Sequence, residues 1–213
     1  NNVKGLYIDY GYPYAKVERE AIKHLGIDML PYEDHSYLTD IQKEGENLWG
    51  EIFPGRNWIL SIIASKYIKS RGEIWMAAIG GEVKELWGDK SEYYFTNASR
   101  ILSNQLNKSI RVTTPFKNFT KGQLVEWYIQ QGLSVDLLKK TVSCHYITEY
   151  NQVPCGECMG CAHRFVGMSY NNIIETHEKD VKAFTKKLYT KEINNSLSEF
   201  SPQRLKEIKS AIE

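Results

Sequence analysis

Apolar and polar positions along the chain follow two periods, and each period predicts one kind of element. Short apolar stretches predict β-strands at residues 3–9, 27–32, 73–79 and 110–113. The stretch at 73–79 is apolar at almost every position, which is typical of a strand inside a parallel sheet. Longer stretches with apolar residues on one helical side predict α-helices at residues 15–25, 57–70, 91–106 and 121–131.

The order of these elements predicts the fold class. Strands and helices alternate along the chain, which favours an α/β fold with an open parallel sheet and helices on both faces. We expect this domain to occupy residues 1–142 and residues 143–213 to form a small C-terminal appendage. The tail at 178–213 predicts two helices, broken around Asn194 and Asn195, with Pro202 at the start of the second.

Composition narrows the class of protein. The chain has 213 residues, with 27 Lys and Arg against 26 Asp and Glu, so its formal net charge is +1. A near-neutral chain does not suit a general polyanion binder, and we expect no nucleic-acid partner. No apolar run has the length of a membrane span and residues 1–4 carry no signal peptide, so we expect a cytoplasmic protein. Because the chain does not begin with methionine, we expect further sequence upstream of Asn1.

Residues 28–51 differ from the rest of the chain in charge. They contain seven acidic residues and a single basic one, Lys43. We interpret this segment as a solvated loop with a short helix, because a run of charge is usually a wet surface. A mobile lid over a binding site is the alternative.

The four cysteines of the chain lie within 18 residues of one another, at Cys144, Cys155, Cys158 and Cys161. Two overlapping C-x-x-C spacings let adjacent thiolates face one ion, and Gly156 and Gly160 give the backbone freedom to fold around it. Four thiolates suit a closed tetrahedral zinc site of the structural kind. The sequence therefore predicts a structural Zn²⁺ site.

Other interpretations of the cysteines stay open. His145 or His163 could supply the fourth ligand in place of Cys144. The cysteines could instead be buried or redox-active thiols, and C-x-x-C-x-x-C also occurs in iron–sulfur proteins. A disulfide framework would be spread along a secreted chain, which does not fit this clustering.

Three segments are expected at the carboxyl edge of the sheet, where ligands of open parallel sheets bind. They are Asp9-Tyr10-Gly11, Gly80-Gly81 and the turn Phe53-Pro-Gly-Arg-Asn57. Arg56 at the start of a helix could hold a phosphate or carboxylate. The equally weighted alternative is a simple turn with Asn57 as the helix cap.

Three further side chains are candidates for a role at this edge of the sheet. Asp9 either orients a ribose or metal or closes its turn, and Asp89, taken alone, favours a helix cap over a catalyst. Lys121 begins a helix, where the helix dipole disfavours a cation, and this weakly indicates a ligand. Aromatic residues gather near the predicted strand ends and could stack on a purine, although most aromatics pack in cores: Tyr10, Tyr12, Tyr14, Trp87, Tyr93, Tyr94 and Phe95.

Taken in order, several motifs resemble the 7-cyano-7-deazaguanine synthases of the queuosine pathway. The resemblance covers roughly residues 3–170 and is carried by Ile8-Asp-Tyr-Gly11 with Glu18, Phe53-Pro-Gly-Arg-Asn57, Thr114-Pro115 with Lys121, Cys144, and Cys155-Gly-x-Cys158-x-x-Cys161-x-x-Arg164. It implies an adenine-nucleotide α-hydrolase-like, Rossmann-like fold. It also implies a ligase that uses ATP with Mg²⁺ and ammonia to convert 7-carboxy-7-deazaguanine, through an amide, to the nitrile.

The resemblance also implies roles for individual residues. The four cysteines match the zinc ligands of the family, and Arg56 and Lys121 match cations that would stabilise phosphate charge, with Asp89 as a further catalytic candidate. Nucleotide-binding positions are expected at Asp9, Tyr10, Gly11, Gly55, Asn57 and Gly80. The oligomeric state stays open, with a homodimer as one alternative.

The chain departs from the family pattern at three places. The Ser-Gly-Gly-x-Asp-Ser phosphate loop of the family is absent from these 213 residues, Tyr-Gly-Gln reads Tyr10-Gly11-Tyr12, and Tyr-Pro-Asp-Cys-Arg reads Trp87-Gly-Asp-Lys-Ser91. Our leading hypothesis is a deazaguanine-nitrile ligase whose phosphate loop lies upstream of Asn1. A relative that attaches a deazapurine to a protein or nucleic acid in a conflict system, and a non-catalytic zinc-stapled binding module, are the alternatives.

Overall fold

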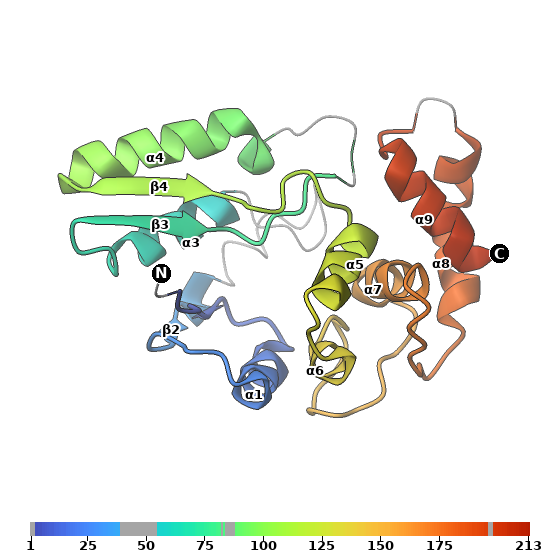
Figure 1. Ribbon diagram of the computed structural model, residues 1–213. Helices are drawn as coiled ribbons and strands as arrows, with labels where there is room; N and C mark the ends of the chain where they lie inside the picture. Colours follow the sequence, from blue (N-terminus) through green and yellow to red (C-terminus); the bar gives the residue numbers. More distant parts are fainter. Residues whose placement is uncertain (1–2, 39–54, 82, 84–87, 196–197) are drawn as a thin grey trace.

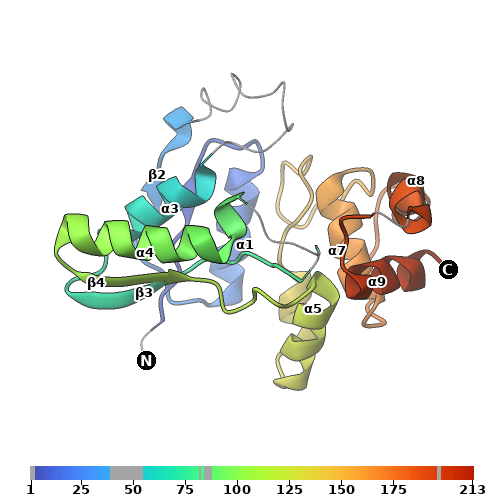
Figure 2. The same cartoon turned by 90° about the horizontal axis from the view of Figure 1, so that it is seen from above.

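A computed structural model describes residues 3–38, 55–81, 83, 88–195 and 198–213, except the side chain of Asp89. Two short parallel strand pairs with their helices form one part of the molecule, and the C-terminal helices gather at the other side (Figures 1 and 2). The chain is thus an α/β protein, as the element order predicts.

The first strand pair joins β1 (Ile8–Asp9) to β2 (Glu33–Asp34), with α1 (Ala15–Leu25) between them in sequence. Gly26 ends α1 in the left-handed region at φ +63°, as predicted. The strand predicted at 27–32 is largely wrong: a single bridge pairs Met29 with Gly5, and the ladder begins only at Glu33. Pro31 explains the shift, because proline has no N–H to donate to a ladder.

The second pair joins β3 (Arg71–Trp75) to β4 (Ser109–Thr113) in parallel, with Gly72 opposite Ile110 and Trp75 opposite Thr113. The helices α3 (Arg56–Ser65) and α4 (Glu92–Leu106) flank it in sequence. The strand predicted at 73–79 therefore begins and ends earlier. Its last ladder bond runs from Met76 N to Thr113 O at 2.8 Å, because the partner strand stops before Pro115.

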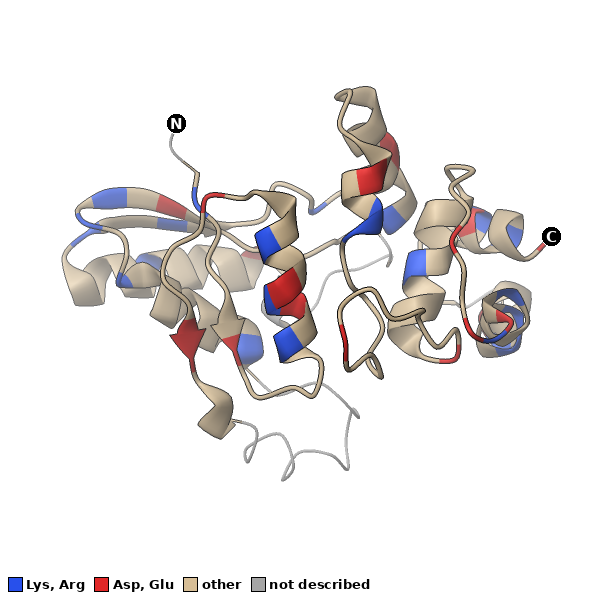
Figure 3. Ribbon diagram, turned by 90° about the horizontal axis from the view of Figure 1, so that it is seen from below, with Lys and Arg blue, Asp and Glu red and all other residues tan. Residues whose placement is uncertain are grey.

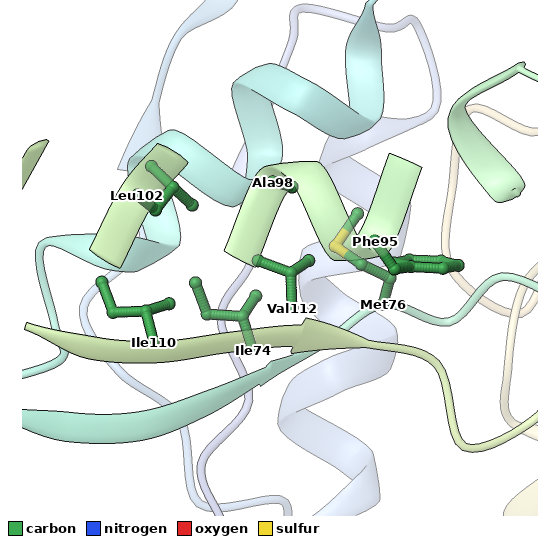
Figure 4. Close-up of a cluster of buried hydrophobic side chains, with 7 residues drawn as sticks. All are labelled: Ile74, Met76, Phe95, Ala98, Leu102, Ile110 and Val112. Atoms are coloured by element: carbon green, nitrogen blue, oxygen red, sulfur yellow. The ribbon is translucent and has the colours of Figure 1, made fainter. Parts of the chain in front are cut away.

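The main core lies between the β3–β4 pair and α4 (Figure 4). It consists of Ile74, Met76, Phe95, Ala98, Leu102, Ile110 and Val112, and side chains of α3 pack against the same cluster. The opposite face of the pair is exposed: Arg71, Glu73, Trp75, Ser109 and Arg111 alternate with the core residues. Helices therefore cover one face of this pair rather than both, which corrects the prediction.

The single sheet predicted from the sequence is also wrong for the described residues. No ladder joins the β1–β2 pair to the β3–β4 pair within them. Side chains connect the two halves instead, since Lys66 and Tyr67, just after α3, both bind the Glu33 carboxylate in β2.

The C-terminal side is helical. It contains α5 (Lys121–Gln130), α6 (Val135–Lys139), α7 (Met159–Ser169), α8 (Val181–Asn194) and α9 (Pro202–Ile212). The two tail helices and the break at Asn194 are as predicted, whereas the alternating pattern did not predict α7 within the cysteine region. The helices α5, α8 and α9 all pack against α7, so the cysteine segment is the centre of this side rather than a loop on it.

Two further features of the fold are the distribution of charged residues and the position of the acidic segment. Basic and acidic positions are interspersed over the ribbon in the view of Figure 3. Most of the acidic segment 28–51 lies outside the described residues; its described part holds β2 and a short 3₁₀ helix at Ser36–Leu38. Across the described ranges, no helix combines the length and apolar character that crossing a membrane requires.

Candidate functional site

The four cysteines converge on one point. Their Sγ atoms all lie within 4.8 Å of one another, and those of Cys155 and Cys161 are 3.9 Å apart. Around a single zinc ion, tetrahedral Zn–S bonds of ~2.3 Å place sulfurs about 3.8 Å apart. The spacing therefore fits one ion at the centre of the four sulfurs, and it is too long for a disulfide.

Backbone N–H groups donate to three of the sulfurs. Cys155 N donates to the Sγ of Cys144 at 3.5 Å, Glu157 N to Cys155 at 3.3 Å, and Cys161 N to Cys158 at 3.4 Å. The last bond makes Cys158 the N-cap of α7. Such bonds stabilise thiolates, which are the form that binds a metal. The hydrogen bond from the Cys161 side chain also lowers the pKa of Cys158.

The geometry separates the alternatives left open by the sequence. Within the described residues, the group able to surround one ion consists of the four cysteines and includes neither histidine. His163 lies near Arg204, with Nδ1 3.3 Å from its guanidinium, and His145 stacks on Tyr14. In an iron–sulfur cluster the thiolates bind different irons and so stand farther apart than around one ion. The donor set and spacing thus fit a single thiophilic ion with no open position.

Gly160 lets α7 pack closely against the segment at residues 143–145, which precedes it in the sequence. A Cβ at this position would overlap the carbonyl oxygen of Ser143 and come within 2.9 Å of His145 Nε2. The cysteine cluster and this close approach together fix the position of residues 143–145.

Two adjoining cavities open beside that segment, and Lys121 and Ser143 line both. The larger has a volume of about 330 Å³ and mainly apolar walls, with Phe116, Trp127 and Tyr128 among them. The smaller has a volume of about 240 Å³ and polar walls that include Tyr14 and Glu18. The arrangement places one cation at the junction between an apolar and a polar chamber.

The start of α5, which carries Lys121, packs against α7 and α9. It is the first residue of α5, whose N-cap Thr120 forms a capping box with Gln123. Gly167 of α7 makes room for the lysine stem, since a Cβ there would come within 2.8 Å of the lysine Cγ. Glu207 of α9 accepts hydrogen bonds from the Thr120 hydroxyl and from Gly122 N, the latter at 3.3 Å.

A buried carboxylate at this helix start is favourable because it faces the positive end of the α5 dipole. Glu207 and its neighbour Arg204 are both fully buried and lie 3.6 Å apart. The tail thus fixes the α5 N-terminus that carries Lys121. Sequence reasoning missed Glu207, because no local pattern links it to residues 85 positions earlier.

Arg164 is a second buried cation and lines the larger cavity. Its guanidinium donates to both Glu175 oxygens, at 2.7 and 2.8 Å, and to the Thr141 hydroxyl at 2.7 Å. It also donates to Leu138 O at 3.1 Å. Arg164 therefore ties α7 to α6 and to the chain that leads to the cysteines.

Replacing Arg164 with methionine is expected to lower the free energy of unfolding by about 3 kcal/mol, because it leaves the half-buried Glu175 carboxylate without its partner. The control is Glu73→Gln, which breaks the exposed Arg111 pair and should cost less than about 1 kcal/mol. Chemical denaturation of both variants measures the difference. Equal effects would show that Arg164 does not anchor this region.

Asp9 forms a local network at the end of β1. Its Oδ1 accepts from Gly11 N at 2.7 Å, and its Oδ2 binds Arg19 and the Tyr32 hydroxyl, the latter at 3.4 Å. This geometry agrees with the interpretation that Asp9 closes its turn. A nucleotide-binding role for Asp9, Tyr10 and Gly11 stays a prediction.

Arg56 begins α3 close to the end of β1. Burial raises the pKa of Tyr10, and the positive charge of Arg56 opposes that rise. The alternative in which Asn57 caps the helix is wrong: the N-cap is Gly55, at φ +75°, and Asn57 is buried within the helix. Phe53 and Pro54 lie outside the described residues.

Gly80 is buried. The neighbouring Gly81 contacts the loop before α5, because its N–H donates to Phe119 O at 3.0 Å. The N-cap of α4 is Ser91, which accepts a hydrogen bond from Tyr94 N at 3.1 Å, whereas the side chain of Asp89 lies outside the described part of the structure. Among the described candidates, the structure brings Lys121 beside the cysteine cluster, whereas Asp9 and Arg56 line neither cavity.

The sequence matches a known family model, described as queuosine biosynthesis protein QueC, over residues 3–172. Three relatives bear the name 7-cyano-7-deazaguanine synthase. The one from Methanococcus aeolicus is 22% identical over 63% of this chain, and the chain spans 59% of that relative, less than two thirds of its length. Those from Methanothermobacter thermautotrophicus and Rickettsia felis are each 24% identical, over 76% and 80% of this chain and 81% and 77% of their own lengths. The matched range contains the cysteines and Lys121, and it ends before α8.

Proposed function

This chain belongs to the QueC family of queuosine biosynthesis proteins, and we propose on that premise that it is an ATP-dependent ligase that converts 7-carboxy-7-deazaguanine and ammonia to 7-cyano-7-deazaguanine. Its partners are then small molecules, and its place is the cytoplasm. The names of its three relatives support the reaction.

The observation that carries the proposal is the pair of cavities that share Lys121. A ligase of this kind must bring a purine-like ring and the phosphates of ATP to one point. A cation at the start of a helix, between a polar and an apolar chamber, is suited to the negative charge that meets there.

The chemistry explains why a cation is needed. A carboxylate is a poor electrophile, so one of its oxygens first bonds to the α-phosphorus of ATP and pyrophosphate leaves. Ammonia then displaces AMP and gives the amide. A second ATP adenylates the amide oxygen and releases pyrophosphate, and loss of AMP together with both protons of the amide nitrogen gives the nitrile. Lys121 stabilises the negative charge that accumulates at the phosphate oxygens.

The nucleotide would be held by groups that the sequence singles out. We propose Arg56 and Asp89 as further catalytic residues beside Lys121. ATP with Mg²⁺ would lie against Asp9, Tyr10, Gly11, Gly55, Asn57 and Gly80, where Mg²⁺ would offset the phosphate charge.

The four cysteines would hold a structural Zn²⁺. Its chemistry there is to bind four thiolates with no open position, so it fixes the fold and takes no substrate. Because Ser143 and Cys144 both line the smaller cavity, holding the cysteines in place also holds a wall of that cavity.

The test uses the protein expressed from its own start codon, incubated with 7-carboxy-7-deazaguanine, ammonia and ATP. We expect AMP and pyrophosphate that depend on the deazapurine, and a product with the mass of the nitrile. Absence of deazapurine-dependent AMP would contradict the proposal. AMP release that requires a protein or nucleic acid in place of ammonia would replace it with the conjugating alternative.

A further inference from the structure

The smaller cavity has a carboxylate that the proposed reaction does not use. Glu18 lies on α1 and lines the cavity together with Lys121, Tyr14 and His145. The cavity has a volume of about 240 Å³, which is below the roughly 300–1,000 Å³ of sites for drug-sized ligands. It therefore suits a single heterocyclic base.

Glu18 is fixed at one oxygen. The Tyr7 hydroxyl donates to Oε2 at 2.7 Å and also lies 3.3 Å from Ala15 O. Among the described residues, no partner binds Oε1. A carboxylate has about four acceptor positions, so Glu18 keeps most of its capacity for a ligand.

The surroundings of Glu18 favour a planar ligand. Tyr14 stacks on Tyr12, with ring centroids 5.2 Å apart and planes within 6°, and His145 stacks on Tyr14 at 5.6 Å. Of these rings, Tyr14 and His145 line the cavity, so part of its wall is aromatic. Desolvation raises the pKa of Glu18, which marks it as a carboxyl group that gains from a new hydrogen-bond donor.

The charges in the cavity define the two ends of the ligand. Glu18 offers only acceptors when ionised, and Lys121 offers only donors. A 7-deazaguanine carries two adjacent donors, the N1–H and the 2-amino group, on the edge remote from its 7-carboxylate. Adjacent donors match one carboxylate, and the 7-carboxylate matches the lysine.

We propose that Glu18 selects the substrate by accepting hydrogen bonds from the N1–H and 2-amino group of its pyrimidinone ring. The inference rests on the proposed function, because it takes the deazapurine as the ligand. It assigns the smaller cavity to the deazapurine ring and directs the reacting carboxylate to Lys121.

The first test needs no variant. Titration calorimetry compares the wild-type protein with 7-carboxy-7-deazaguanine and with the same molecule lacking its 2-amino group. We expect the analogue to bind about 10- to 100-fold more weakly, because it leaves an acceptor of a half-buried carboxylate unpaired. Equal affinities would overturn the inference.

The second test is Glu18→Gln, with Glu20→Gln as the control. The amide oxygen that Glu18→Gln introduces still accepts from Tyr7, so the fold is kept, whereas the amide nitrogen now faces the donor edge. We expect Glu18→Gln to lose the preference for the amino-bearing ligand. Glu20 pairs with Lys23 on the same helix, and the Glu20→Gln protein should keep that preference.

The outcomes separate the two proposals. The role of Glu18 would be overturned if the wild-type protein forms the nitrile but binds the ligands with and without the 2-amino group equally well. It would also be overturned if the Glu18→Gln protein still binds the amino-bearing ligand more tightly. Both results would leave the proposed function standing. A wild-type protein that neither binds nor converts 7-carboxy-7-deazaguanine would overturn both.

Discussion

Replacing Lys121 with methionine is expected to lower kcat by about 10²- to 10³-fold while the protein stays folded. Methionine keeps an unbranched apolar stem that can lie against Gly167, and it removes only the charge at the junction of the two cavities. The loss should be in kcat more than in KM, because negative charge builds up on the phosphate oxygens and the leaving pyrophosphate as the transition state forms. Rates of deazapurine-dependent AMP release measure it.

The matched control is Lys117→Met. Lys117 is exposed, pairs with Glu92 at 3.3 Å, and precedes the same helix. Its substitution should leave kcat within about twofold, as for other surface changes. If the two variants have the same activity, Lys121 does not act on the reacting groups.

Replacing Cys158 with serine is expected to remove the metal and unfold the C-terminal side. A hydroxyl is a poor ligand for zinc, and Cys158 also caps α7, against which α5, α8 and α9 pack. We expect metal content to fall from about one ion per chain to near none, and stability to fall by several kcal/mol, since structural zinc contributes directly to folding.

Elemental analysis and thermal unfolding of the purified variant measure both effects. The control is Glu157→Gln, next in sequence to Cys158, which removes an exposed pair with Lys179 and leaves all four sulfurs in place. Unchanged zinc stoichiometry in Cys158→Ser would contradict the four-cysteine site.

Local sequence patterns predict the features that depend on neighbouring residues. The cysteine cluster follows from spacings of three residues, and it forms as predicted. The helices after Tyr14 and Thr120 follow from apolar periodicity, and Gly26 and Pro202 mark a helix end and a helix start. In each case the signal and its consequence lie close together in the sequence.

Features that depend on distant residues are not in those patterns. The bond from Thr120 to Glu207 joins residues 87 apart, and Arg164 of α7 donates to Leu138 O of α6, 26 residues away. The sheet prediction failed for a related reason. Alternation of strands and helices indicates parallel pairing, but it does not show that Pro31 shifts the start of β2. It also does not show that one face of β3 stays uncovered, with Trp75 exposed on it.

The central claim is that this chain activates the carboxylate of a deazapurine by adenylation. The most direct measurement labels both oxygens of that carboxylate with a heavy isotope and examines the AMP released in the first step by mass spectrometry. The account predicts that AMP gains one labelled oxygen, because the carboxylate oxygen bonded to phosphorus leaves with it. Unlabelled AMP, or label in inorganic phosphate, would contradict the account.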